Sequence, residues 1–375
     1  MYLLTQIARY FVGILFIFSG LIKLNDPVGT QIKLEEYFDV FATDIPAMAG
    51  LFHGLIPLAL YISVLLCVAE VILGIAVLIK YKMRTTLWVL LLLIIFFTFL
   101  TFYSAFFNKV TDCGCFGDAI KLTPWSSFTK DVILLVLILF LFSQKSHLGA
   151  RTSTRTSNVI MGASLLGSVV LAIYAIVYMP LIDFLPYKKG ANLPRLMQPS
   201  AKLQYAYKME KDGQIVELTQ YPSDTTYVFK EMVLLNPEAQ PKVTDYAVWN
   251  NEGDYTQETF TGNKLIIIIQ NVEKTNTQGI EKVNTLAKSL KDSNIEPIVL
   301  TSADEAAFEA FRHEHQLAIP YYFADATVLK SMSRTNPGVI LMQNGTIVGK
   351  WPTPSLPDAV TIQSMAGGGS KAAQN

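Results

Sequence analysis

Two of the three cysteines in this chain stand one residue apart, in the run Asp112-Cys113-Gly114-Cys115-Phe116-Gly117-Asp118. Cysteines at this spacing can form a disulfide if the chain turns between them, and a glycine allows such a turn. A ring this small is strained, and strained, exposed disulfides exchange readily with other thiols. The spacing therefore predicts Cys113 and Cys115 as the catalytic residues of a thiol–disulfide exchange reaction.

Two other interpretations of the cysteine pair stay open. A fixed disulfide that only pins the loop fits the sequence almost as well, and the flanking Asp112 and Asp118 oppose a reactive thiolate because negative charge raises a thiol pKa. A metal site is disfavoured, because no histidine lies nearby and zinc takes about four ligands. The third cysteine, Cys67, falls in a long apolar run and is expected to be a small buried side chain.

Glu70 is a carboxylate in the middle of another apolar run. An ionisable residue inside a membrane segment is costly, so it needs a partner and indicates a function. We predict a membrane ion pair between Arg9 and Glu70. The alternatives are an ion pair that only fixes helix packing, a protonated glutamate that donates a hydrogen bond, or a group that handles a quinone or a lipid.

Long apolar runs must place these residues in a membrane. The chain is 51% hydrophobic and only 16% charged, whereas soluble proteins carry about 25% charged residues. A membrane-crossing helix needs about 20 mostly apolar residues. Four runs meet this length, and Val132–Phe142 meets it only if Trp125–Asp131 adds its outer turns. The four runs are Gln6–Leu24, Gly54–Ile79, Leu87–Phe107 and Val159–Met179.

The charges in the short loops predict the orientation of these spans, since cytoplasmic loops are rich in lysine and arginine. Basic residues follow the second and fourth spans, at Lys80, Lys82, Arg84, Lys145, Arg151 and Arg155. The loop after the first span is mainly acidic. We therefore expect the amino terminus inside and everything after Met179 outside, which in a bacterium is the periplasm. The pattern alternates only if the short fourth span is real.

The first outer loop carries apolar residues at helical spacing, namely Leu34, Tyr37, Phe38 and Phe41. This pattern suits either a helix lying on the outer membrane surface or a short helix capping the bundle. Small residues in the first span, Gly13, Ser19 and Gly20, predict close packing against a neighbouring helix.

These motifs resemble a known membrane family. The pattern from Arg9 through Gly13, Phe16 and Gly20 to Lys23-Leu24, together with Glu70-x3-Gly74, resembles the DoxX superfamily. The Cys-Gly-Cys-Phe-Gly run resembles the outer loop of its MauE branch, whose members are implicated in maturing methylamine dehydrogenase. The resemblance covers about residues 1–145, and it implies a small helical bundle with a redox or maturation role in the cell envelope.

The second half of the chain has the composition of a soluble protein. Residues 181–240 are expected to be a connector with a β-hairpin, whose turn contains Asp212-Gly213. From about residue 241, strands alternate with helices, and Asn344-Gly345 predicts a closing hairpin. Leu265–Gln270 is continuously apolar, as a central strand of a parallel sheet is. Residues 361–375, rich in glycine, alanine and serine, are expected to be disordered.

The order of elements over about residues 240–360 resembles the thioredoxin superfamily. Pro337 matches the position of that family's cis-proline, but the segment Asn271–Gly279 lacks the redox cysteines, and no cysteine follows Cys115. The domain is therefore expected to lack thiol chemistry of its own. Pro337 is a candidate peptide-binding residue, because the surface it shapes could pair with an extended chain. The alternative is that it only shapes the turn.

Together these observations predict a membrane helical bundle of four to five transmembrane helices followed by an α/β thioredoxin-like domain. The expected divisions are a bundle over 1–145, a fifth transmembrane helix within 146–180, the connector, the α/β domain over 241–360 and the tail. Expected partners are membrane lipid and a periplasmic client protein or thiol–disulfide partner. No cofactor or metal is predicted. Thirty basic residues balance thirty acidic ones, which argues against nucleic-acid binding. A membrane scaffold with a structural disulfide is the main alternative function.

Overall fold

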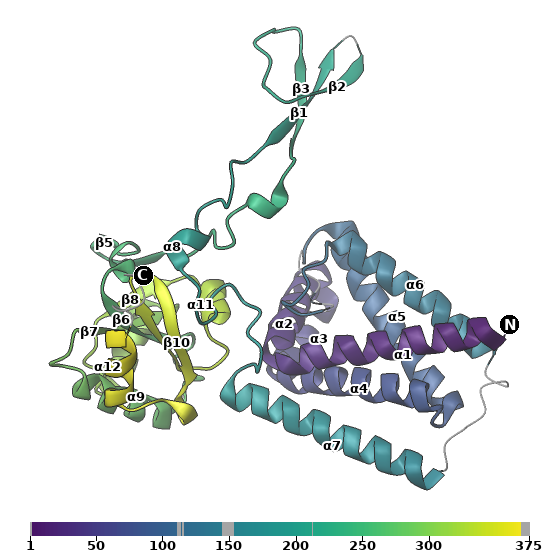
Figure 1. The fold of residues 1–375 in the computed structure, drawn as a ribbon, viewed down its shortest axis with the longest axis horizontal. Coiled ribbons are helices and arrows are strands. Elements are labelled where there is room, and N and C mark those ends of the chain that lie inside the picture. The colour runs from purple at the N-terminus through teal and green to yellow at the C-terminus, as the bar shows by residue number, and fades with distance from the viewer. Residues whose placement is uncertain (1, 111–113, 115, 145–153, 212, 369–375) are drawn as a thin grey trace. The chain divides into compact units, whose positions relative to one another are not determined.

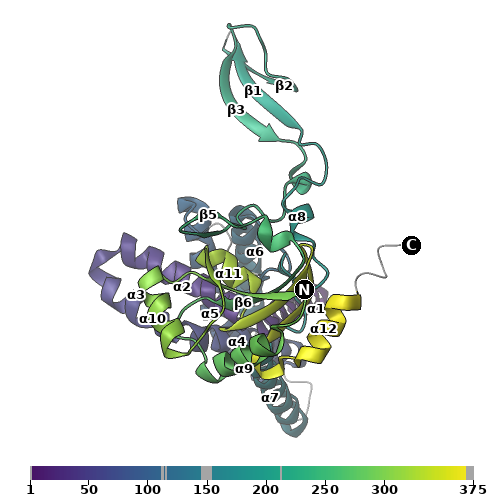
Figure 2. The same ribbon diagram turned by 90° about the vertical axis from the view of Figure 1, so that its left-hand side faces the viewer.

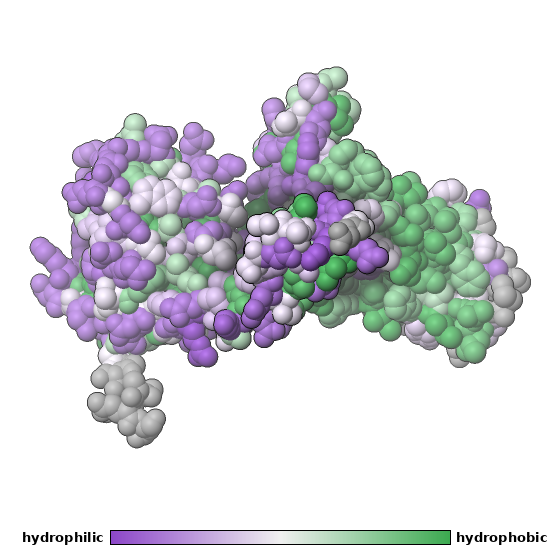
Figure 3. Space-filling view, turned by 90° about the horizontal axis from the view of Figure 1, so that it is seen from above, coloured by the Kyte–Doolittle hydropathy of each residue, from purple (hydrophilic) through white to green (hydrophobic). Residues whose placement is uncertain are grey.

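The computed structural model describes residues 2–110, 114, 116–144, 154–211 and 213–368. They divide into two units, residues 1–184 and residues 185–375. Among the described residues, five helical segments of the first unit are long and apolar enough to cross a membrane. The first unit is accordingly the membrane part of a multi-pass protein, and Figure 3 shows the green, hydrophobic surface of its helices.

The five spans agree with the sequence prediction, including the short fourth one. They are built from α1 (Tyr2–Asn25), α4 (Ala59–Ile79), α5 (Met83–Phe107), α6 (Pro124–Ser143) and α7 (Thr154–Tyr178). The α4 span is extended by α3 (Ala49–Leu55) and two short 3-10 turns, Pro46–Met48 and Ile56–Leu58. Thr123 caps α6 by accepting from the amide of Ser126. Because this cap lies nine positions before the start of the apolar run at Val132, Trp125–Asp131 becomes part of the helix and gives it full length.

Glycines set the distance between α1 and α4, which lie side by side in Figure 1. A Cβ atom on Gly20 would come within 2.9 Å of the Val71 amide nitrogen, and one on Gly74 would come within 2.7 Å of the Gly13 carbonyl oxygen. No other residue allows backbones to approach this closely. The predicted packing role of Gly13 and Gly20 is therefore confirmed.

The helix after the first span, α2 (Pro27–Asp44), caps the bundle. Its four predicted apolar residues, Leu34, Tyr37, Phe38 and Phe41, are all buried. Tyr37 and Phe41 pack with Leu100 and Val110, whereas Leu34 and Phe38 pack with Ala59. Of the two interpretations of this segment, the capping helix is the one that the structure supports.

The second unit contains a seven-stranded mixed sheet with the order β10-β9-β6-β7-β8-β4-β5. Strands β6 (Asn263–Ile269), β7 (Ile295–Thr301) and β8 (Tyr321–Ala324) are parallel. The antiparallel strands are β9 (Gly338–Gln343), β10 (Thr346–Pro352), β4 (Val248–Asn250) and β5 (Gly253–Asp254). Asn344 and Gly345 both have positive φ values, 45° and 74°, as the predicted hairpin turn requires.

Alternating residues of β6 form two cores, one on each face of the sheet. Leu265, Ile267 and Ile269 pack against α9 (Thr277–Ser289), α10 (Glu305–Glu314) and α12 (Ala359–Gly368). Ile266 and Ile268 pack on the other face, with residues of α11 (Ala326–Met332) and β4. This two-sided burial explains why the strand is apolar throughout. The helical bundle followed by a thioredoxin-like α/β domain confirms the predicted fold class.

The connector between these parts holds more structure than one hairpin. After a short helix, α8 (Leu193–Leu196), strands β1 (Tyr205–Lys211), β2 (Gln214–Leu218) and β3 (Val228–Leu234) form an antiparallel sheet with the order β2-β1-β3. The β1–β2 hairpin is the predicted one, and β3 pairs with the other edge of β1. Figure 2 shows this small sheet projecting from the rest of its unit.

The prediction of a disordered tail from residue 361 is wrong for residues 361–368. These residues continue α12, in which Ile362 and Ala366 are buried in the core with β9 and α9. Asp358 precedes the helix, and its carboxylate accepts a hydrogen bond from the amide of Thr361 at 2.9 Å. Small residues suit a helix that packs closely, so glycine and alanine content alone misled the prediction.

Candidate functional site in the helical bundle

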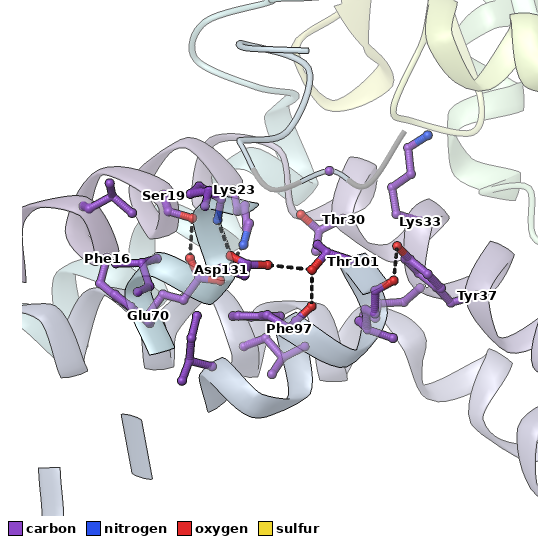
Figure 4. A pocket seen from close by; sticks show the side chains of 18 residues that line it. Phe16, Ser19, Lys23, Thr30, Lys33, Tyr37, Glu70, Phe97, Thr101 and Asp131 are labelled. Atoms are coloured by element: carbon purple, nitrogen blue, oxygen red, sulfur yellow. Dashed lines mark hydrogen bonds and ion pairs between the residues drawn. The ribbon is translucent and has the colours of Figure 1, made fainter. Parts of the chain in front are cut away.

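A cavity in the first unit brings together side chains from α1, α2, α4, α5 and α6 (Figure 4). The cavity volume that the centre of a water molecule can occupy is about 60 Å³. Its apolar walls come from Leu15, Phe16, Leu34, Leu66, Ile94, Phe97, Leu100 and Leu134, and its polar lining from Ser19, Lys23, Thr30, Lys33, Tyr37, Glu70, Thr101, Lys130 and Asp131, with Gly114 beside them. A pocket of apolar walls with a few convergent polar groups is the usual form of a ligand site in a helical bundle.

Glu70 forms a buried ion pair with Lys23 in this cavity. The Lys23 Nζ atom lies 2.5 Å from Glu70 Oε1, and the two side chains are 9% and 2% exposed. Ser19 donates a hydrogen bond to the other carboxylate oxygen at 2.7 Å. The Lys23 ammonium also lies 4.6 Å from the centre of the Phe97 ring. Both oxygens of the carboxylate are therefore satisfied by donors from a single neighbouring helix, α1.

The predicted ion pair between Arg9 and Glu70 is wrong. Arg9 instead donates from its guanidinium to the backbone carbonyls of Val77 and Leu78, in the last turn of α4. Helix ends leave carbonyls without intrahelical partners, and a basic side chain satisfies them there. The register explains the change of partner. Gly20 contacts Val71, which puts Lys23 one turn from the level of Glu70, whereas Arg9 lies about 16 Å along the helix from Gly20.

A second buried carboxylate, Asp131, lines the same cavity from α6. It is 1% exposed, it pairs with the neighbouring Lys130, and it accepts a hydrogen bond from the Thr101 hydroxyl at 3.0 Å. Figure 4 shows Asp131 and Thr101 near the Lys23–Glu70 pair, with Lys33 pointing away from the middle of the cavity. Sequence reasoning missed this group, although Asp131 is the only acidic residue from Pro124 to Ser143.

The cysteine loop meets this cavity at one described residue. Cys113 and Cys115 lie outside the described residues, but Gly114 between them lines the cavity. A Cβ atom on Gly114 would lie 3.3 Å from the Lys33 side chain. Phe116, which follows the second cysteine, is buried against Phe18, and its ring lies 5.4 Å from the Lys130 ammonium. The structure thus puts the middle of the motif at the cavity's lining.

The remaining predicted site residues lie elsewhere. Cys67 is buried in α4 with its thiol free, as expected for a small packing residue. Among the described residues, no group of three or more His, Cys, Asp or Glu side chains could hold a metal ion.

Pro337 lies in the second unit, and its peptide bond to Asn336 is cis, as the thioredoxin resemblance implied. The residue is buried, and a Cβ atom on Gly279 of α9 would lie 3.2 Å from its ring. The Asn336 carbonyl already accepts from the amide of Asn276 at 3.1 Å. These contacts hold the turn at Pro337 within its own unit, and peptide binding at Pro337 stays a prediction.

Comparison with known proteins finds a family that the first part of the chain is similar to. Residues 1–144 match the family model of the methylamine utilisation protein MauE. The match runs through α6, so it includes every residue of the cavity and the Cys113–Cys115 loop. It stops before α7 and the whole second unit. A search of curated proteins finds no relative that matches this chain.

Solved structures resemble about a third of the chain. A thiol peroxidase from Chromobacterium violaceum is 17% identical, and the match covers 34% of this chain and 85% of that one, with a TM-score of 0.27. A thiol:disulfide interchange protein from Bacteroides sp. is 14% identical over 35% and 92% of the two chains, with a TM-score of 0.27. A secreted disulfide oxidoreductase from Mycobacterium tuberculosis is 10% identical over 33% and 96%, with a TM-score of 0.25.

Proposed function

We propose that this protein is a membrane-bound thiol–disulfide redox or maturation accessory of the bacterial cell envelope, acting through Cys113 and Cys115. The observation that carries the proposal is the position of Gly114. The residue between the two cysteines lines a cavity that also holds both buried carboxylates, which supports a single site for the sequence motif and the buried charges. The match of this region to the MauE family supports the same conclusion. We also propose that the helical bundle is related to the wider DoxX superfamily.

The second unit would then recognise a client protein without reacting with it. No cysteine follows Cys115 in the sequence, and the loop after β6, where thioredoxin-like enzymes carry their thiols, is held by polar contacts. Asn336 donates to the carbonyl of Asn271 at 2.6 Å and accepts from the amide of Gln270 at 3.1 Å. Chemistry and recognition would thus be divided between the two units.

This division of labour requires that both units meet the same compartment. We propose that the amino terminus is cytoplasmic and that the cysteine loop and residues 185–375 face the periplasm of a bacterial inner membrane. An odd number of spans, five here, puts the two ends of the chain on opposite sides of the membrane. Alkaline phosphatase fused after residue 184 should be active, whereas a fusion within Lys80–Lys82 should be inactive. The reverse result contradicts the proposal.

Trapping of mixed disulfides tests the chemistry. If one cysteine attacks a partner disulfide and the other resolves it, removing the resolving cysteine leaves the partner covalently attached. We expect Cys113→Ser or Cys115→Ser to accumulate a reducible, higher-mass adduct in non-reducing gels of whole cells. Cys67→Ser is the matched control. Because the Cys67 thiol is buried, its replacement should leave the wild-type gel pattern unchanged.

The alternative is a non-enzymatic scaffold or assembly factor whose cysteine pair is a fixed staple. In that case neither single variant forms an adduct, and the wild-type disulfide resists mild reductant in the folded protein. That pair of results would remove the redox proposal and leave the binding role.

A further inference from the structure

A groove lies between α4 and α7, which lie side by side in Figure 1, and it shares no lining residue with the cavity described above. Its apolar lining comes from Ile72 of α4 and from Met161, Gly162 and Leu165 of α7. The space in it that the centre of a water molecule can occupy is about 510 Å³. Both helices are long and apolar enough to cross a membrane, so the groove belongs to the part of the protein that hydrocarbon surrounds.

The groove is open because α7 is held to its neighbours on either side of it. In the second half of α7, Ala172 packs with Val68 in a buried cluster. Near the start of α7, the Tyr81 hydroxyl donates to the Asn158 side chain at 2.9 Å. Between these two contacts Gly162 is exposed, and a Cβ atom on it would meet no atom within 4 Å. Helices packed along their whole length leave no such space, because each missing neighbour forfeits dispersion attraction.

The polarity of the groove changes along its length. Ile72 lies about 10 Å along α4 from Ile79, the last residue of that helix, so the apolar lining reaches into the hydrocarbon. Tyr81 and Lys82 follow α4, in the turn before α5, and line the polar end of the groove. A charged group at the membrane boundary with an apolar channel beneath it has the same order as a phospholipid, whose headgroup lies at the boundary.

The polar end of the groove attracts anions. Lys82 is exposed, and its ammonium lies 5.4 Å from the centre of the Tyr81 ring. Among the described residues, no carboxylate pairs with this ammonium. Residues 71–111 and 132–182, which include the end of α4 and the whole of α7, contain basic residues and no acidic one. Basic pockets between membrane helices bind anionic lipid headgroups.

We propose that this groove holds a phospholipid with an anionic headgroup. One acyl chain lies along Ile72, Gly162 and Leu165, and the Lys82 ammonium pairs with the headgroup phosphate. A free phosphate ion would leave the apolar lining uncovered, and a zwitterionic phospholipid lacks the net negative charge that the basic end attracts. A second copy of the chain could cover the apolar lining but brings no phosphate to Lys82.

Native mass spectrometry of the delipidated full-length protein in detergent counts the bound lipids. We expect dioleoyl phosphatidylglycerol, which is anionic, to bind more tightly than dioleoyl phosphatidylcholine. Lys82→Gln should weaken phosphatidylglycerol binding about fivefold, the effect of one basic residue near an anionic headgroup. Lys80→Gln is the matched control and should change this binding much less, because Lys80 belongs to the same turn but does not line the groove.

Gly162→Leu tests the place of the acyl chain. The leucine side chain fills the apolar part of the groove and should remove the most tightly bound phosphatidylglycerol. Gly167→Leu is the matched control, because Gly167 also lies in α7 with no atom within 4 Å of a Cβ atom, but it does not line the groove. This variant should keep the wild-type affinity.

Four results overturn the site. They are equal affinity of the wild-type protein for the two lipids, equal effects of the two lysine variants, equal effects of the two glycine variants, and displacement of phosphatidylglycerol by inorganic phosphate. A wild-type dimer that Gly162→Leu dissociates and that phosphatidylglycerol leaves intact also overturns it, because a second copy then occupies the groove.

Discussion

The two units of this protein treat buried polarity in opposite ways. In the helical bundle, two carboxylates and one ammonium group, from three helices, are buried together in one cavity. In the α/β unit, the two cores on either face of the sheet are built from aliphatic and aromatic side chains. Its polar loop after β6 makes hydrogen bonds within its own unit, to the segment before Pro337.

The comparison separates groups that hold a fold together from groups that serve a site. The polar contacts of the loop after β6 satisfy backbone donors and acceptors, which any fold must do. The charges of the bundle satisfy one another, and a lipid-facing protein could have omitted them. The candidate site therefore lies in the helical bundle, the unit in which burying a charge costs more.

The largest expected effect comes from breaking the Lys23–Glu70 pair. Glu70→Ala leaves the Lys23 ammonium buried without its partner, which should lower the free energy of unfolding by about 3–5 kcal/mol. Unfolding in mixed detergent micelles measures the change. Lys23→Met/Glu70→Leu should recover most of the loss, because both charges are then absent.

Glu36→Ala is the control for that prediction. Glu36 pairs with Lys33 at 3.8 Å and is 41% exposed, so its removal should cost about 0–1 kcal/mol. If Glu70→Ala and Glu36→Ala lowered the free energy of unfolding equally, burial of the Lys23–Glu70 pair would not affect stability. Additive losses in the Lys23/Glu70 double variant would show that the two residues are not coupled.

In the α/β unit, the corresponding large effect should come from an apolar residue. Ile362→Ala removes a side chain that is 0% exposed in the core beneath α12, and should cost about 2–5 kcal/mol. Hydrogen exchange of β9 in the full-length protein should become faster. Val360→Ala, at a position 73% exposed, should leave exchange unchanged. Unchanged exchange in both variants would mean that α12 is not part of the core.

The sequence predicted elements well where local pattern decides. The apolar run of β6 and the Asn344-Gly345 turn depend on neighbouring residues, so the sequence predicts both, whereas the position of the cis-proline follows only from the resemblance to the thioredoxin superfamily. The ion pair was missed because its partner depends on helix register. Distances from the helix ends favoured Arg9, whereas the contact of Gly20 with Val71 puts Lys23 beside Glu70. Asp131 was missed because it was assigned to the outer turns of a short span.

A smaller effect tests the register itself. Gly20→Ala would put a Cβ atom 2.9 Å from the Val71 nitrogen and 3.0 Å from the Cys67 oxygen, so α1 and α4 must separate. We expect a loss of about 1–3 kcal/mol in unfolding free energy. Gly162→Ala in α7 meets no atom within 4 Å and should be neutral or stabilising, since alanine favours helix. A loss of similar size in both variants would contradict the close approach.

The smallest effect concerns one exposed carboxylate in the α/β unit. Hydrogen bonds from the side chain and amide of Thr361 hold the pKa of Asp358 below its usual value. Its contribution to stability is therefore present above the unfolded pKa, about 3.9, and is lost as the pH falls through the lower folded pKa. Asp358→Asn keeps an oxygen that can accept from Thr361 but cannot titrate. Thermal unfolding between pH 3 and pH 6 should show a slightly weaker pH dependence for the variant, and an identical pH dependence would mean that the charge at the start of α12 contributes nothing.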